Sequence, residues 1–334
     1  MCHVGNWLTR KGGSCQQKMK RKFAFIWGGI LLVLLFLCNA VWALPGGRDW
    51  KNWANSDLET LQLLKKQHNE VIHSGQVIKD FSQGRLSKAV AAQSLEKISA
   101  SASIHFSRFL KIEFPTDQNL KACGTDLMRS QLKQIKAASG VLKRDKIDRL
   151  DLLALQSGEV NVYRSQNRYF RARSHSVRLL VQNMKAIKQQ IDTKRGISKV
   201  QYPTTELMEY YQYQNSLLEW QLEELGYAEK LTFALNNLSQ GKKANAAIVV
   251  GKIKALRQKC AKSVAPSSVS KLKQAYNQEL DSFYRFAEAV ALIEADKSQD
   301  SLSRLYRYSS KLQKDSRAFE EANVVVLQSC LDNI

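Results

Sequence analysis

The sequence predicts an all-α protein, in which an N-terminal transmembrane or signal helix precedes two tandem antiparallel units that resemble four-helix bundles. Three observations favour this fold class. Only 4 prolines and 16 glycines occur among 334 residues, and both residue types interrupt helices. Apolar residues recur at steps of three and four over long stretches. No alternating apolar run is long enough to require a β-strand.

Residues 23–44 form the first predicted element, a run of 22 residues without a charge. A helix of that length reaches about 33 Å, enough to cross a hydrocarbon core of about 30 Å. Residues 1–22 hold six basic residues and no acid, so the positive-inside rule places them in the cytoplasm and the body outside. We expect aromatic anchors at the outer interface, and they are Trp42, Trp50 and Trp53.

A cleaved signal peptide is the alternative for the same segment. Met19 begins a compact basic stretch, so residues 1–18 are possible products of an early start codon. The most apolar run, 30–37, has the length of a signal-peptide core, and a cut after Ala43 fits the small-residue rule. Either interpretation exports the body. The protein is expected to be single-pass and extracytoplasmic, or else cleaved and periplasmic or secreted.

The first predicted unit covers residues 45–195. Ser56 and Glu59 have the spacing of a capping box, which predicts a helix start at Ser56. Gly84 suits the position after a helix, where a positive φ is needed. Ser87, and Thr116 or Asp117, are expected to cap the next two helices. The predicted helices are 56–82, 87–114, 117–139 and 144–194, with Gly158 as a possible break in the last.

The second predicted unit covers residues 196–334 and repeats this plan. Phe81-Ser82-Gln83-Gly84 matches Leu238-Ser239-Gln240-Gly241 at an offset of 157, which suggests a duplication. The expected caps are Thr204 or Thr205, Ser267 or Ser268, and Ser298. The predicted helices are 205–241, 243–264, 268–295 and 298–334.

Two apolar stripes in the second unit predict which faces are buried. Each follows steps of three and four, the period of one helix face. The first stripe is Val269, Leu272, Tyr276, Leu280, Phe283, Ala287 and Val290. The second stripe, which includes polar residues, is Leu302, Leu305, Ser309, Leu312, Ser316, Phe319, Asn323, Val326 and Cys330.

No motif points to catalysis, to a metal or to another cofactor. The sequence lacks a phosphate-binding loop and a nucleophile elbow. Glu70 and His73 have a di-iron spacing, but no second copy exists. We therefore expect a non-enzymatic protein. Cys260 and Cys330 are the pair best placed for a disulfide, and buried free thiols are the equal alternative.

The most distinctive feature is a basic stretch between residues 163 and 196. It holds nine basic residues and one acid, within a chain whose net charge is +21. A guanidinium row suits phosphates and carboxylates, and a solvated helix face is the plainer interpretation. The candidate anion-binding residues lie on one face and are Arg164, Arg168, Arg171, Arg178 and Lys185, with His175 between them. The predicted core face beside them is Phe170, Val177, Leu180, Met184, Ile187 and Ile191.

Three functions are consistent with these features. The leading hypothesis is an interaction or scaffold module of the cell envelope with a protein partner. The alternatives are an extracytoplasmic ligand-binding or sensory bundle, which needs a pocket between helices, and a protein that binds an anionic polymer or lipid through residues 164–195. The membrane is an expected partner through residues 23–44. A small-molecule ligand is not indicated by any residue, and nucleic acid is disfavoured.

Overall fold

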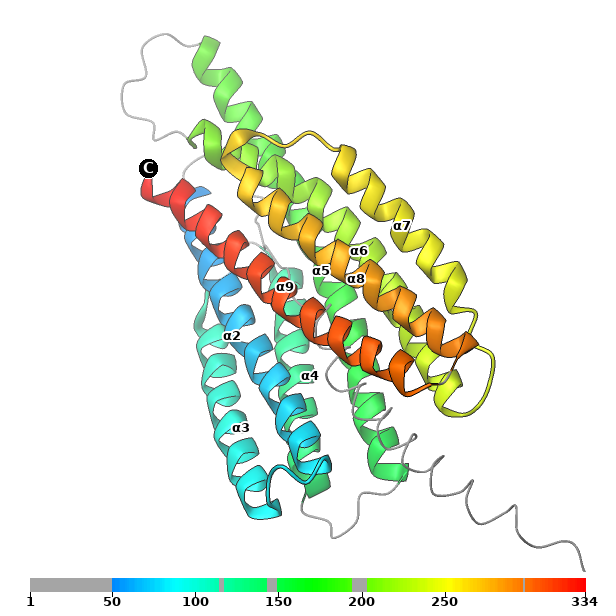
Figure 1. Ribbon diagram of the computed structural model, residues 1–334. Helices are drawn as coiled ribbons and strands as arrows, with labels where there is room; N and C mark the ends of the chain where they lie inside the picture. The colour runs from blue at the N-terminus through cyan, green and yellow to red at the C-terminus, as the bar shows by residue number, and fades with distance from the viewer. Residues whose placement is uncertain (1–49, 114–116, 143–148, 194–202, 297) are drawn as a thin grey trace, which may run out of the picture.

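The computed structural model describes residues 50–113, 117–142, 149–193, 203–296 and 298–334, and in these ranges it is helical without a β-strand (Figure 1). The predicted all-α class is confirmed. The predicted segment 23–44 lies outside the described residues, and no described helix combines the length and apolarity of a membrane span. The helices are α2 (Trp50–Ser82), α3 (Lys88–Lys111), α4 (Gln118–Leu142), α5 (Arg149–Thr193), α6 (Thr205–Ser239), α7 (Ala246–Lys262), η1 (Ser267–Val269), α8 (Ser270–Ala295) and α9 (Gln299–Asp332).

Consecutive helices pack on one another in two groups, from α2 to α5 and from α6 to α9, and α2 also packs on α4. The two groups meet where α5 packs on α6 and α2 packs on α9 (Figure 1). One cluster of buried apolar side chains runs through both groups, and a smaller one lies among α2, α3 and α4. The described helices therefore share a continuous core.

Side chains that accept from backbone amides begin four of the helices, as the sequence predicts. Ser87, Thr204 and Ser298 each accept from the amide three residues later, and Asp117 accepts from Leu120 N at 2.9 Å. Such bonds satisfy amides that have no partner within the helix. The predicted glycines also occur where φ is positive, at +71° for Gly84 and +75° for Gly241.

The predicted start of α2 at Ser56 is wrong, because the helix begins six residues earlier at Trp50. Ser56 Oγ donates to the carbonyl of Asn52 inside the helix, as serines in helix interiors do. Trp50 and Trp53 are each only 3% exposed, and Trp53 packs edge-on against Tyr211 of α6. These two tryptophans are therefore core residues and not membrane-interface anchors. Burial of their rings gives the first turns of the helix tertiary contacts, and the helix accordingly extends to Trp50.

Two other helix starts depend on distant residues. The predicted caps Ser267 and Ser268 lie in η1, before α8 begins at Ser270, and Ser268 Oγ donates to Glu209 of α6. At the start of α7, the Glu294 carboxylate accepts from three successive amides, which lowers its pKa. Those amides belong to Ala244, Asn245 and Ala246.

The predicted buried faces of the last two helices are confirmed. Every residue of both stripes is less than 9% exposed, including the polar members on α9. Burial of those polar groups requires hydrogen-bond partners. Asn323, for example, accepts from the Gln214 amide of α6 at 2.7 Å. The stripe on α9 is therefore a contact face for neighbouring helices with polar as well as apolar partners.

A buried polar cluster lies where the two groups of helices meet. Arg173 of α5 is fully buried and donates to Gln214 of α6 at 3.3 Å, and Gln214 in turn donates to Asn323 of α9. Nearby, the Tyr211 hydroxyl donates to the buried Asp57 carboxylate of α2 at 3.3 Å. Directional bonds of this kind specify the register between helices more sharply than apolar contact alone.

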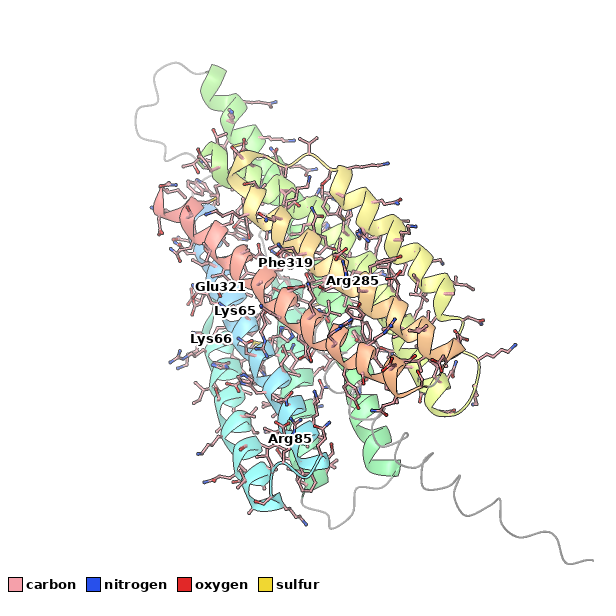
Figure 2. The ribbon with its side chains drawn as sticks, in the orientation of Figure 1. Lys65, Lys66, Arg85, Arg285, Phe319 and Glu321 are labelled. Carbon is pink, nitrogen blue, oxygen red and sulfur yellow. The ribbon has the colours of Figure 1, made fainter. Side chains whose placement is uncertain are left out.

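A second polar contact joins α2 to α9. Buried His68 lies 2.6 Å from the carboxylate of buried Glu320, and burial raises the pKa of that carboxyl group. At the surface beside this pair, Lys65 and Glu321 form an ion pair, and Figure 2 shows them facing one another across the two helices. The junction between α2 and α9 thus combines an ion pair at the surface with a buried hydrogen bond.

Candidate anion-binding surface

The five basic residues that the sequence singles out all lie exposed along α5. Exposed positions recur at 164, 168, 171, 175, 178, 182 and 185, while Phe170, Val177, Leu180 and Met184 on the adjoining face are buried. From Arg164 to Lys185 the row extends about 32 Å at 1.5 Å per residue. We call Arg164, Arg168, Arg171, Arg178 and Lys185 the α5 basic face.

Acidic neighbours approach two members of the α5 basic face, and only at long range. Arg168 is 3.9 Å from Asp126 of α4, and Arg178 is 3.8 Å from Glu219 of α6. Both arginine side chains remain more than half exposed, so water screens these pairs. Arg164, Arg171 and Lys185 have no carboxylate within 4 Å among the described residues. The face therefore keeps most of its positive charge available.

A cleft of about 770 Å³ opens beside one end of this face, between α4, α5 and α6. Arg164 and Arg168 line it from α5, and Lys133 adds a third basic side chain from α4. Glu229 of α6 is its acidic residue. The remaining lining residues are Ser130, Gln134, Ala137, Asn161, Tyr163, Ser165, Asn167 and Leu225.

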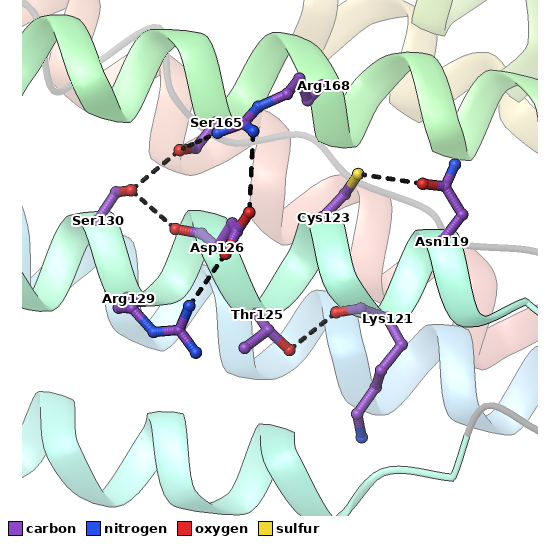
Figure 3. A network of polar contacts seen from close by, with 9 residues as sticks. All are labelled: Asn119, Lys121, Cys123, Thr125, Asp126, Arg129, Ser130, Ser165 and Arg168. Carbon is purple, nitrogen blue, oxygen red and sulfur yellow. Dashed lines mark hydrogen bonds and ion pairs between the residues drawn. The ribbon is translucent and has the colours of Figure 1, made fainter.

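Hydrogen bonds hold α4 and α5 together at the edge of the cleft, as Figure 3 shows. The hydroxyl groups of Ser130 and Ser165 lie 2.9 Å apart, and Arg168 donates to Ser165 at 3.5 Å. Asp126 stands between Arg168 and Arg129, at 3.9 Å and 3.0 Å. These contacts orient Arg168 along the cleft without burying its guanidinium.

Arg173 departs from the simple picture of a basic helix exposed to solvent. It belongs to the same basic stretch, yet it is fully buried and bonded to Gln214. Helical phase is the signal that separates it, because Arg173 lies between the buried positions Phe170 and Val177 at steps of three and four. A count of basic residues along the stretch does not distinguish the buried Arg173 from the exposed arginines.

The cysteines of the second half are inert thiols in the structure. Cys260 and Cys330, the predicted disulfide pair, are both buried and free. Burial raises the pKa of Cys260 to about 12 and that of Cys330 to about 11. A thiol so protonated at neutral pH is a poor nucleophile and a poor metal ligand.

The described residues contain no group of three or more histidines, cysteines and carboxylates suited to a metal ion. Glu70 and His73, which have the di-iron spacing, do not converge on a third ligand there, since Glu70 accepts a hydrogen bond from Ser101 of α3 and His73 is exposed. Comparison with known proteins adds no assignment: no family model, no curated protein and no solved structure matches the chain. The α5 basic face and its cleft are therefore the features from which function is inferred.

Proposed function

We propose that the protein is a helical interaction module that holds an anionic partner on its α5 basic face. The observation that carries this proposal is the alignment of five exposed basic side chains, three of which have no carboxylate within 4 Å among the described residues. Guanidinium groups bind carboxylates, sulfates and phosphates through paired hydrogen bonds. A row of them favours a partner with repeated negative charge, because each neutralised group adds to the affinity.

We further propose that the module works on the extracytoplasmic side of a membrane. The basic run before residue 23 and the uncharged segment 23–44 support this orientation. The test is a reporter fused after Ile334 that is active only outside the cytoplasm. A reporter active inside the cytoplasm would remove the export hypothesis and leave the binding proposal intact.

Two four-helix units, 45–195 and 196–334, are the arrangement that we propose for presenting this face. Matching helix ends support the duplication. Lys121 is the fourth residue of α4, and its ammonium donates to the carbonyls that end α3. Lys273 is the fourth residue of α8, and its ammonium donates in the same way to carbonyls at the end of α7.

The binding proposal is tested by a charge-matched pair of variants. The first variant changes Arg164, Arg168, Arg171 and Arg178 to glutamine. The control removes four positive charges elsewhere, from the exposed lysines Lys97, Lys252, Lys254 and Lys262. The probe is dextran sulfate, and binding is measured by titration calorimetry over a series of salt concentrations.

We expect the arginine variant to weaken binding by about tenfold or more and to flatten its salt dependence. The control should stay within about twofold of the wild type, since its charges lie away from α5. Equal losses in both variants would show that net charge alone attracts the polyanion. That result would overturn the α5 basic face as a site.

A further inference from the structure

The lining of the cleft between α4, α5 and α6 is rich in neutral hydrogen-bonding groups. Three carboxamide side chains and two serine side chains line it together with the three basic residues. A site that recognises its ligand by charge alone does not require this many neutral donors and acceptors. A ligand with several hydroxyl groups can form hydrogen bonds with them. The five neutral groups are Ser130, Gln134, Asn161, Ser165 and Asn167.

Gln134 places a buried carboxamide in the wall of the cleft. Its side chain lines the cleft but is only 6% exposed, and its Oε1 atom has no hydrogen-bond partner among the described residues. Buried amide oxygens are nearly always bonded, because leaving one unpaired is unfavourable. Oε1 accepts and does not donate, so a ligand group that bonds to it is a hydroxyl or amine donor and not an anion.

The charged groups around Gln134 call for the opposite kind of ligand atom. Lys133, Arg164 and Arg168 are donors without acceptor capacity, and they suit a carboxylate or sulfate. One ligand that satisfies both requirements carries hydroxyl groups and an acidic group on the same small ring. Acidic sugars have this combination of groups.

We propose that the cleft binds a sugar unit of an acidic polysaccharide, whose chain continues along the α5 basic face. This inference rests on the proposed function and names its partner. The concave shape favours a single polymer strand over a lipid bilayer, because a flat membrane surface does not enter a cleft between helices. Tyr163, the aromatic residue of the cleft, is 4% exposed and offers no open ring face on which nucleobases would stack.

The experiment compares two polyanions of matched charge. A heparin-derived oligosaccharide carries hydroxyls, carboxylates and sulfates, whereas polyacrylate carries carboxylates without hydroxyls. Three variants leave the charge of the cleft unchanged: Gln134→Leu, Asn161→Ala and Asn167→Ala. The matched control is Gln258→Ala, at an exposed position on α7 far from the cleft in sequence and outside its lining. Asn161 is exposed, so its variant tests the proposal even where Gln134→Leu perturbs folding.

We expect each cleft variant to weaken binding of the oligosaccharide about threefold to tenfold and to leave polyacrylate binding and the salt dependence unchanged. Gln258→Ala should match the wild type for both probes. Unchanged oligosaccharide binding in all three cleft variants would overturn this inference, while the arginine variant would still report separately on the α5 basic face. Cleft variants that weaken binding to anionic phospholipid vesicles instead would also overturn it, in favour of a lipid headgroup.

Discussion

Two sets of polar side chains on the same helix behave in opposite ways. The α5 basic face is exposed and pairs with acids only at 3.8–3.9 Å, while Arg173, two residues after Arg171, is fully buried in a network that reaches α6 and α9. The first set stays hydrated and is available to a partner. The second has lost its water and depends on protein groups for its hydrogen bonds. Position around the helix, and not residue type, therefore separates the exposed arginines of α5 from the buried one.

Replacing Arg173 with alanine should have the largest effect on folding. The change removes the donor to Gln214 and leaves a cavity at the junction of α2, α5, α6 and α9. We expect the free energy of unfolding to fall by about 3 kcal/mol or more, the range for breaking a buried charged network. Urea denaturation followed by circular dichroism measures it. A loss below about 1 kcal/mol would mean that the cluster contributes little to holding the helices together.

The pH dependence of stability should depend on a buried carboxyl group in the second half. Glu224 accepts from Tyr276 at 3.0 Å, and burial raises its pKa from 4.5 to about 8. The folded state thus favours the protonated form, so the stability that this carboxyl group contributes is fully present below pH 4.5 and is lost as the pH rises through about 8. Glu279 on α8, also buried with a raised pKa, adds to the same trend.

Glu224→Gln should flatten this trend, because an amide keeps the shape of the neutral acid and does not ionise. At pH 8 and above we expect the variant to be more stable than the wild type by a few kcal/mol, since each pKa unit corresponds to about 1.4 kcal/mol. Thermal unfolding across the pH range measures the difference. Parallel curves for the two proteins would contradict the assignment of this carboxyl group.

A pair of glycine variants extends the same contrast between interior and surface. A Cβ at Gly124 would lie 2.6 Å from the ring of Phe109 and 3.2 Å from that of Tyr169, so Gly124→Ala should destabilise the fold by about 1–3 kcal/mol. Gly226→Ala meets nothing within 4 Å and should stabilise α6 by up to about 1 kcal/mol. If both variants changed the free energy of unfolding in the same direction, the packing of α3 against α4 at Gly124 would be contradicted.

The smallest effect is expected on the α5 basic face itself. Arg171→Gln should change the free energy of unfolding by less than about 0.5 kcal/mol, because exposed charges contribute little to stability. The same variant should still weaken dextran sulfate binding. A large loss of stability would show that Arg171 packs inside the protein. The contrast between an exposed α5 basic face and a buried Arg173 would then be wrong.

The periodic pattern of the sequence predicted most of what is local. The stripes on α8 and α9 are buried, the phase of α5 places the arginines of the α5 basic face in solvent, and Ser87, Thr204 and Ser298 begin helices. These features follow from the 3.6-residue repeat and from the shortage of hydrogen-bond partners at helix ends, which any segment carries with it. The basic residues of the candidate site were accordingly found from the sequence.

Contacts between distant segments decided the rest. The start of α2 depends on Tyr211 packing against Trp53, and the start of α7 depends on Glu294, about 50 residues further along the chain. The cleft, with Gln134 in its wall, exists only because α4, α5 and α6 lie side by side. By itself the sequence determined the helices and their faces, because both depend on neighbours within a few residues. Which faces meet depends on partners far away in the chain, so the tertiary structure alone decided that a buried arginine joins the halves and that neutral polar groups gather beside the exposed arginines.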